Sequence, residues 1–209
     1  MKITCISDTH GRHSELTLPT ADVLVHAGDF TEAGTKKETL DFLDWFSRQE
    51  HEHKVLIAGN HDFFLEKNQK QLDFLPANIH YLNDSGTKIG KYNFWGSPVT
   101  PGNSNWAFER ARGKSIRKHW EKIPENTNVL ITHTPPYKIM DILDNGTAIG
   151  CEELQRYVDT IEPQLHIFGH IHNSYGSVRT KKTLFINSSC LDGRYRNINA
   201  PITYSVEDS

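Results

Sequence analysis

Short apolar runs recur along this chain, and five of them are followed at once by polar residues. The five runs are dominated by aliphatic residues and lack alternating polar positions, which is typical of strands buried on both faces. They lie at residues 3–6, 23–25, 55–58, 129–131 and 165–168. The pattern predicts a buried sheet in an α/β fold.

Between these runs the apolar residues change to helical spacing. Residues 36–48 predict a helix, because Phe42 and Phe46 share one face. Two sheets packed face to face with flanking helices would accommodate the remaining elements. These elements are predicted helices at 63–75 and 151–161 and predicted strands at 79–82, 87–89, 92–95, 177–179, 183–186 and 202–206.

Length and charge set the outer limits. With 209 residues and 36% hydrophobic content, the chain is long enough for one sizeable core and short for two, so we expect a single domain over residues 1–209. The 23 basic and 26 acidic residues give a formal net charge of −3, which predicts neither a nucleic acid polymer nor an anionic membrane as a partner. No apolar run approaches the roughly 18 residues of a membrane span.

The amino terminus and the cysteines predict a cytoplasmic location. Residues 1–4 lead straight into the first apolar run and leave no room for a signal peptide. The cysteines, Cys5, Cys151 and Cys190, are odd in number and have no Cys-x-x-Cys spacing. We therefore expect reduced, structural thiols in a cytoplasmic protein.

Each of the five buried runs is followed by side chains that bind metal ions. Asp8 and His10 follow the first run, and their spacing places both on one side of an extended segment. His170 and His172 repeat this spacing after the last run. The other three runs are followed by Asp29, Asn60 and His133. Because ligand sites in α/β sheets lie outside such strand ends, and because clustered carboxylates repel one another, the sequence predicts a metal centre here.

The types of ligand indicate the metal and the chemistry. Imidazole, carboxylate and amide oxygen suit borderline divalent ions, so we expect manganese, with iron or zinc as alternatives. Two such ions roughly 3.5–4 Å apart clamp the attacking and leaving oxygens of a phosphoryl transfer and lower the pKa of bound water to about 7. The expected nucleophile is a metal-bound hydroxide, because the sequence has no Gly-x-Ser-x-Gly elbow or Walker loop.

The order of these motifs resembles that of the calcineurin-like metallophosphoesterase superfamily. The likeness rests on Asp-x-His, Gly-Asp, Gly-Asn-His-Asp, a lone His and Gly-His-x-His over residues 8–172. A finer likeness is to the metallophosphoesterase-domain-containing proteins of animals and their microbial relatives, a class III phosphodiesterase-like branch. It is carried by the segments 7–10, 26–32, 95–98, 132–136 and 169–176.

This resemblance implies a fold and a role for each ligand. The implied fold is a four-layer α/β/β/α sandwich, in which two mixed β-sheets are flanked by helices. His61 is implied to face the phosphate, where it stabilises the transition state and protonates the leaving group. The implied metal ligands are Asp8, His10 and His172 for one ion, Asn60, His133 and His170 for the other, and Asp29 as a bridge between them.

His61 and Asp62 each have a second interpretation. His61 is alternatively an eighth metal ligand or a residue at the start of a helix, because both nitrogens of an imidazole bind metals. Asp62 is expected to cap the helix that follows it, and orientation of His61 is its alternative role. Asn60 and His61 are also the expected contacts to the substrate.

Most other histidines have ordinary expected roles. His51 and His53 lie in a charged stretch, which predicts exposure to solvent. His26 and His166 lie in apolar runs and are expected in the core. The alternative for His26 is that it orients a ligand by hydrogen bonding.

The sequence after Asp29 bears on the substrate. Phe30, Thr31 and Glu32 stand where Ser/Thr phosphatases have a Val-Asp-Arg-Gly ending, which argues against a phosphoprotein substrate. We expect a phosphodiesterase that acts on a small-molecule phosphoester, of nucleotide type. The alternatives are a phosphomonoesterase for a small metabolite and a non-catalytic scaffold that retains the fold.

The segment 96–114 is the least regular part of the chain and a candidate substrate rim. Trp106 is a candidate for stacking on a nucleobase. Alternatively, Trp106 and Phe108 only anchor the loop to the core. A second candidate rim is the segment 187–201, which contains Arg194 and Arg196.

Overall fold

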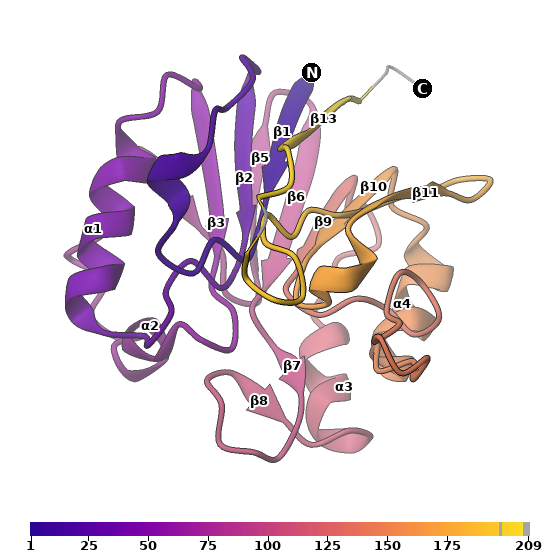
Figure 1. Ribbon diagram of the computed structural model, residues 1–209. Coiled ribbons are helices and arrows are strands. Elements are labelled where there is room, and N and C mark those ends of the chain that lie inside the picture. Colours follow the sequence, from indigo (N-terminus) through magenta and orange to yellow (C-terminus); the bar gives the residue numbers. More distant parts are fainter. Residues whose placement is uncertain (197, 207–209) are drawn as a thin grey trace.

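The apolar runs form two β-sheets that face each other, and helices cover the outer face of each sheet (Figure 1). The structure is a computed structural model that describes residues 1–196 and 198–206. The fold class predicted from the sequence, with two mixed sheets between helices, is confirmed. Among the described residues, no helix has both the length and the apolar character that a membrane crossing requires.

The first sheet is built mainly from the amino-terminal part of the chain. Its strands, in spatial order, are β13 (Ile202–Ser205), β1 (Lys2–Ile6), β2 (Val23–Ala27), β3 (His53–Ile57) and β4 (Ile79–Tyr81). The strands β1 to β4 are parallel, and β13 pairs with β1 in the antiparallel sense. The carboxyl ends of β1, β2 and β3 therefore lie along the same edge.

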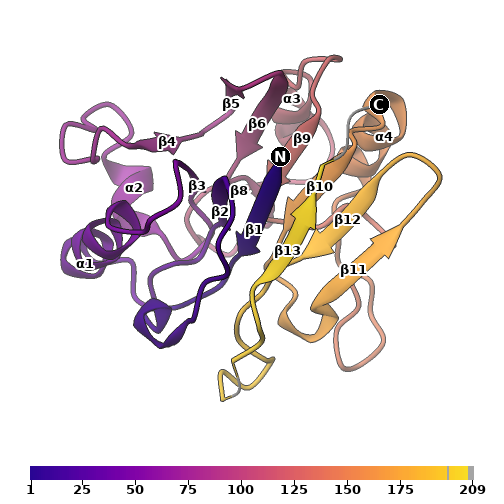
Figure 2. The same cartoon turned by 90° about the horizontal axis from the view of Figure 1, so that it is seen from above.

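The second sheet has the same arrangement, with parallel strands at its centre. Its strands, in spatial order, are β11 (Gly176–Arg179), β12 (Leu184–Asn187), β10 (Leu165–Phe168), β9 (Val129–Thr132), β6 (Tyr92–Ser97) and β5 (Ser85–Ile89). The inner four are parallel, whereas β11 and β5 are antiparallel edge strands. Figure 2 shows both sheets from above.

Three apolar layers hold the sandwich together. The central layer lies between the sheets, where Val25 and Ile57 belong to the same buried cluster as Ile131 and Ile167. A second layer joins the first sheet to its helices, and a third does the same for the second sheet. The helices are α1 (Lys36–Ser47), α2 (Phe63–Lys67), α3 (Lys114–Trp120) and α4 (Glu152–Ile161). Burial of apolar area in these layers is the main driving force for the fold.

Helix α1 follows the sequence prediction closely. Thr35 begins it with a capping box, in which the Thr35 hydroxyl accepts from the backbone of Glu38 and the Glu38 carboxylate accepts from the backbone of Thr35. Phe42 and Phe46 are fully buried on the sheet side, as their spacing predicts. Helix α1 thus forms the crossover between β2 and β3, which pair as parallel neighbours.

One predicted helix is shorter than expected, and one helix was not predicted. The helix predicted over 63–75 ends at Lys67, where the backbone of Asn68 closes the last turn. Leu72 and Leu75 still pack against the same core cluster, so their spacing indicated burial and not helix. Helix α3 was not predicted, because it is short and follows the irregular segment 96–114. That segment also contains two short paired strands, β7 (Thr100–Pro101) and β8 (Glu109–Arg110).

Candidate metal centre

The predicted ligands follow the carboxyl ends of strands from both sheets. In the first sheet they lie after β1, β2 and β3, and in the second after β9 and β10. The two sheets face each other, so these loops meet at one edge of the sandwich. The residues brought there are Asp8, His10, Asp29, Asn60, His61, His133, His170 and His172.

Three overlapping groups of side chains are close enough to hold metal ions. Within each group the ligand atoms lie within 4.8 Å of one another. The groups are Asp8, His10 and His172; His10, Asp29 and His61; and Asp29, His133 and His170. Asn60 joins the last group, since its Oδ1 lies 3.0 Å from His133 Nε2. Asp29 and His10 each belong to two groups, which gives the cluster a continuous chain of ligands.

Main-chain carbonyls orient two of the imidazoles. His133 Nδ1 lies 2.8 Å from the carbonyl oxygen of Ala27, and His172 Nδ1 lies 3.3 Å from that of Asp192. A carbonyl only accepts, so Nδ1 carries the proton in both rings. The Nε2 atoms then face carboxylates, at 3.1 Å from Asp29 for His133 and at 3.5 Å from Asp8 for His172. This arrangement is common for histidines that bind metals through Nε2.

His10 supplies the clearest sign that a cation belongs in the cluster. Its side chain is 1% exposed, and both ring nitrogens are buried without a hydrogen-bond partner among the described residues. Buried polar atoms in native proteins are nearly always satisfied. Burial lowers the pKa of His10, so its ring has a lone pair to offer to an ion. The residues present therefore fit a divalent metal.

The electrostatics of the cluster lead to the same conclusion. Burial alone would raise the pKa of Asp8, but the hydrogen bond and charge of His172 hold it well below its usual range. Burial likewise opposes the effect of His133 on Asp29, yet the pKa of Asp29 is lowered. Against burial, the charge of Asp29 raises the pKa of His133 to about 9. The two carboxylates are therefore ionised and attract a cation.

The backbone that carries the ligands is strained. Asp8, His10, Asp29 and His170 all have positive φ angles, of 53°, 42°, 56° and 68°. A non-glycine residue in such a conformation costs on the order of 1–3 kcal/mol and persists only where its surroundings fix it. Gly169 shows how tight those surroundings are, because a Cβ there would lie 2.0 Å from Asp8 Oδ2. Strain of this kind is typical of functional sites.

His61 lies at the solvent side of the cluster. Its Nδ1 is 2.8 Å from the main-chain oxygen of Glu32, and its backbone N–H donates to Asp29 Oδ1 at 2.7 Å. Its ring is 4.6 Å from that of His10. Since Nδ1 is taken by a carbonyl, Nε2 is the nitrogen that remains for a ligand or a substrate.

Asp62 does not cap the helix that follows it, so that expectation is wrong. Its buried carboxylate accepts from the backbone N–H groups of Asp29, Thr31 and Gly59 and from the Thr31 hydroxyl. Burial and the charge of Asp29 raise the pKa of Asp62 to about 7. Asp62 thus binds the loop after β2 to the loop after β3 and fixes Asp29 in its strained conformation. A local sequence pattern does not show this role, because two of the three partner residues, Asp29 and Thr31, lie about thirty residues away.

The other histidines divide into core and surface. His26 is fully buried; its Nδ1 accepts from the Gly28 backbone, and its Nε2 lies 3.0 Å from the hydroxyl of Thr9. His26 therefore contacts two ligand loops, which supports its alternative role as a residue that orients ligands. His166 is a core histidine, as expected. His51 was expected to be exposed, but it is 7% exposed and bonded to the carbonyl of Pro19.

Two residues of the site were missed by sequence reasoning. Tyr195 has its ring 4.8 Å from those of both His10 and His172. The Glu32 carboxylate lies 3.6 Å from His10 Nδ1. Glu32 had a detectable signal, since it lies three residues after Asp29. Tyr195 had none, because the segment 187–201 was noted only for its arginines.

The aromatic residues of the segment 96–114 have different roles. Phe108 is 1% exposed and anchors the loop in the core. Trp106 is 43% exposed, and its ring lies 4.6 Å from that of His61. Arg194 and Arg196 are exposed and fold over Asp192 through their backbone N–H groups. Of the expected rim residues, Trp106 is thus the one with a direct contact to the cluster.

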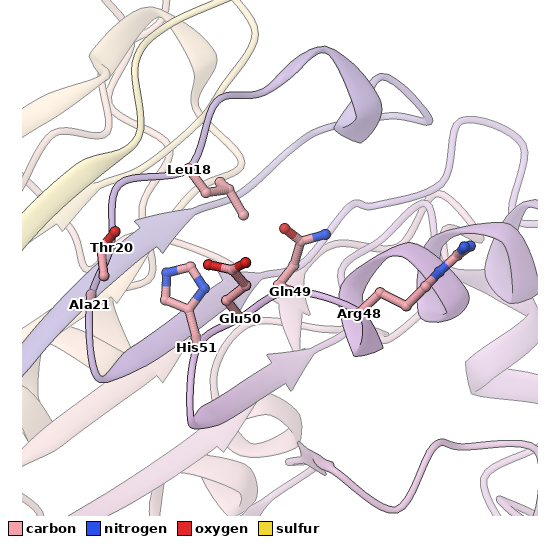
Figure 3. A pocket seen from close by; sticks show the side chains of 7 residues that line it. All are labelled: Leu18, Thr20, Ala21, Arg48, Gln49, Glu50 and His51. Atoms are coloured by element: carbon pink, nitrogen blue, oxygen red, sulfur yellow. The ribbon is translucent and has the colours of Figure 1, made fainter.

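Figure 3 shows a separate hollow of about 450 Å³. It lies where β2 and β3 begin, at the edge of the first sheet opposite the candidate centre. Its lining residues are Leu18, Thr20, Ala21, Arg48, Gln49, Glu50 and His51. None of these is a predicted ligand, so the hollow has no part in the centre.

Known proteins are similar in sequence to this chain over nearly its whole length. The sequence profile described as Calcineurin-like phosphoesterase matches residues 1–174. Metallophosphoesterase domain-containing protein 1 of Homo sapiens is 34% identical over 98% of this chain and 71% of its own length. A UPF0046 protein of Caenorhabditis elegans is 36% identical over 99% of this chain and 75% of its own length.

A solved structure supports the fold. The phosphopantetheinyl hydrolase of Mycobacterium tuberculosis superposes with a TM-score of 0.64 at 14% identity, over 93% of this chain and 90% of that one. Proteins of the matched family depend on divalent metals, and the side-chain groups described above fit such ions. The family match confirms the expectation of a metal-dependent hydrolase acting on phosphoric ester bonds. The chain belongs to the calcineurin-like phosphoesterase family.

Proposed function

We propose that this enzyme is a phosphodiesterase with a binuclear metal centre, acting on small nucleotide-like phosphodiesters. The observation that carries the proposal is the position of Asp29. Its Oδ2 lies 3.1 Å from His133 Nε2 and 4.0 Å from His10 Nε2. One carboxylate thus reaches both groups of imidazoles, which is what a bridging ligand between two adjacent ions must do.

The remaining ligands divide into two sets around Asp29. Asp8, His10 and His172 would hold one ion, and Asn60, His133 and His170 would hold the other. Manganese suits this mixture of nitrogen and oxygen ligands, with iron or zinc as alternatives. When bound, two such ions neutralise phosphoryl charge and acidify water. The protein fixes the ligands beforehand through the carbonyls of Ala27 and Asp192.

His61 is the proposed catalytic residue. Its Nδ1–H is held by the carbonyl of Glu32, so Nε2 is the atom available to the substrate. In the imidazolium form, Nε2 gives its proton to the departing alkoxide oxygen. General acid catalysis of this kind contributes about 10²–10⁴-fold to the rate. Asn60 contacts the same phosphate through its amide.

A comparison of diester and monoester turnover tests the proposal. Bis(p-nitrophenyl) phosphate and p-nitrophenyl phosphate release the same chromophore, so kcat/KM is directly comparable between them. With added manganese, we expect higher kcat/KM for the diester. A higher value for the monoester would instead make the enzyme a phosphomonoesterase for a small metabolite. The Asp29→Ala variant is the control, because turnover that persists in it does not come from this centre.

The free cysteines support a reducing, cytoplasmic environment for this enzyme. Cys5, Cys151 and Cys190 are all buried and unpaired with one another. Burial raises the pKa of Cys190 to about 12 and that of Cys151 to about 11, so both remain protonated and unreactive. These thiols are therefore structural.

A further inference from the structure

A polar hollow of about 510 Å³ lies beside the proposed active site. Trp106 belongs to both, because it lines the hollow and its ring lies 4.6 Å from that of His61. We call this space the Trp106 hollow. Its lining residues are Glu66, Gly102, Asn103, Asn105, Trp106, Glu109, Arg110, Ala111 and Ser115. A substrate whose phosphate is next to His61 therefore has this hollow within reach.

Trp106 is fixed in place despite being exposed. Its backbone N–H donates to Glu109 Oε2 at 3.1 Å, and the next residue but one, Phe108, donates to Glu66 Oε1 at 2.8 Å. Ala107 and Phe108 are buried, so the chain on the carboxyl side of Trp106 is anchored in the core. A fixed aromatic ring with an open surface is a stacking platform that loses little entropy when a ligand binds.

The charges of the hollow indicate which ligands it accepts. The lining contains two carboxylates, Glu66 and Glu109, and one guanidinium, Arg110, so its formal charge is −1. The guanidinium lies 3.8 Å from Glu66 and donates to the carbonyl of Glu109. Arg110 is thus already engaged and balanced. A second phosphate would meet net negative charge here, whereas a neutral ring would not.

The hollow also offers unused polar groups. The side-chain amides of Asn103 and Asn105 and the hydroxyl of Ser115 line it, and none of them bonds to another residue in the described part of the chain. Amides both donate and accept, so they can pair with the edge of a heterocycle. An aromatic platform next to free amides is the chemistry that recognises a nucleobase.

We infer that the Trp106 hollow binds the neutral heteroaromatic base of the phosphodiester that is cleaved at the metal centre. This inference rests on the proposed function and specifies its substrate class. It predicts that Trp106 contributes to the selection of nucleoside-containing diesters over simple alkyl diesters. Loss of one base-stacking contact should weaken binding on the order of 10-fold.

The first experiment compares two diesters with the same leaving group. Thymidine 5′-(p-nitrophenyl phosphate) carries a base, and methyl p-nitrophenyl phosphate does not. The native enzyme is expected to prefer the first, and the ratio of the two kcat/KM values is expected to fall on the order of 10-fold in Trp106→Ala. Trp106→Phe keeps an aromatic ring and is expected to retain most of the preference. An equal ratio in all three proteins would overturn the inference.

The second experiment needs no turnover. Adenosine and thymidine carry no phosphate, and their binding to the metal-free protein can be followed by isothermal titration calorimetry. Saturable binding is expected in the native protein and in Trp106→Phe, and its loss is expected in Trp106→Ala. If no diester is hydrolysed with any metal, the proposed function fails, but nucleoside binding still tests the hollow. If diesters are hydrolysed but neither nucleoside binds, the hollow assignment alone fails.

A third ligand separates a neutral ring from a cation. The carboxylates beside Trp106 raise the alternative of a quaternary ammonium group, which also binds aromatic faces. Choline is therefore titrated under the same conditions as the nucleosides. If choline binds in preference to both nucleosides and this binding is lost in Trp106→Ala, the ligand of the hollow is a cationic headgroup and the inference of a base is wrong. Absence of choline binding supports the neutral ring.

Discussion

His61 donates a hydrogen bond from Nδ1 to the main-chain oxygen of Glu32, at 2.8 Å. The acceptor is backbone, so side-chain substitution at Glu32 does not remove it. The bond fixes the tautomer of His61 and leaves Nε2 for the substrate. His133 has the same kind of bond from Nδ1, to the carbonyl of Ala27, but its Nε2 lies 3.1 Å from the Asp29 carboxylate.

The first prediction follows from this relationship. His61→Ala should lower kcat by on the order of 10²-fold, because a proton donor to the leaving oxygen is lost. The metal content should not change, and elemental analysis of the purified variant measures it. If the variant loses one metal equivalent, His61 is a ligand and not a catalytic residue.

Leaving-group dependence provides the matching control. Diesters with very acidic leaving groups need little protonation, so His61→Ala should slow them less than diesters of poorly acidic alcohols. A plot of log kcat against leaving-group pKa should therefore be steeper for the variant. Parallel plots would restrict His61 to electrostatic stabilisation of the transition state.

The second prediction concerns Asp29. Since its carboxylate reaches the imidazoles of both sets, Asp29→Ala should abolish turnover and lower occupancy of both metal positions. His10→Ala should chiefly empty one position. Metal analysis after dialysis against manganese compares the two variants. Retention of two full equivalents by Asp29→Ala would show that the carboxylate does not bridge.

The third prediction uses the backbone conformation of His170. Its φ is 68°, which glycine adopts without strain, so His170→Gly removes the ligand and preserves the chain path. We expect reduced diesterase activity at low manganese and partial recovery in excess manganese, with an unchanged circular dichroism spectrum. Native manganese dependence in this variant would rule out His170 as a working ligand.

The fourth prediction concerns stability against pH and a residue outside the centre. Burial lowers the pKa of His166 from 6.5 to about 3. Below pH 6.5 the unfolded chain binds a proton at this residue and the folded chain does not. The contribution of His166 to the free energy of unfolding is therefore fully present above pH 6.5 and is lost progressively as the pH falls toward 3. The slope from this group is about 1.4 kcal/mol per pH unit.

Urea unfolding between pH 4.5 and 6.5 measures that slope. His166→Gln should decrease the pH dependence of the unfolding free energy by about 1.4 kcal/mol per unit, whatever its effect on absolute stability. The partly exposed His53 provides the control, and His53→Gln should follow the native curve. Parallel curves for the native protein and His166→Gln would contradict the assignment of a neutral buried imidazole.

The strands and the order of the ligand motifs could be predicted from the sequence, because both are local. Buried parallel strands are continuous apolar runs, and residues that directly follow them have little freedom in where they lie. The resemblance to a known family added the assignment of ligands to two ions. For Asp8 and His133, position along the chain was enough to predict that they meet.

Other features depend on contacts that no local pattern records. Asp62 looks like a helix cap from its neighbours, yet its partners are the backbone of Asp29 and Thr31. Leu72 has helical spacing, yet it lies outside any helix and packs, partly buried, against the core cluster of the first sheet. Tyr195 reaches the ring of His10 from far along the chain. In each case, tertiary structure determines which of several locally acceptable roles the residue takes.

The candidate centre draws its ligands from both sheets. Asp8, Asp29 and Asn60 follow strands of the first, whereas His133 and His170 follow strands of the second. The aliphatic layer between the sheets holds them face to face away from this edge. An ion held by ligands from both sheets would join the sheets at this edge and would help to fix their stacking angle. Metal affinity and sheet alignment would then be coupled, so a core mutation that rotates one sheet would weaken metal binding without changing a ligand.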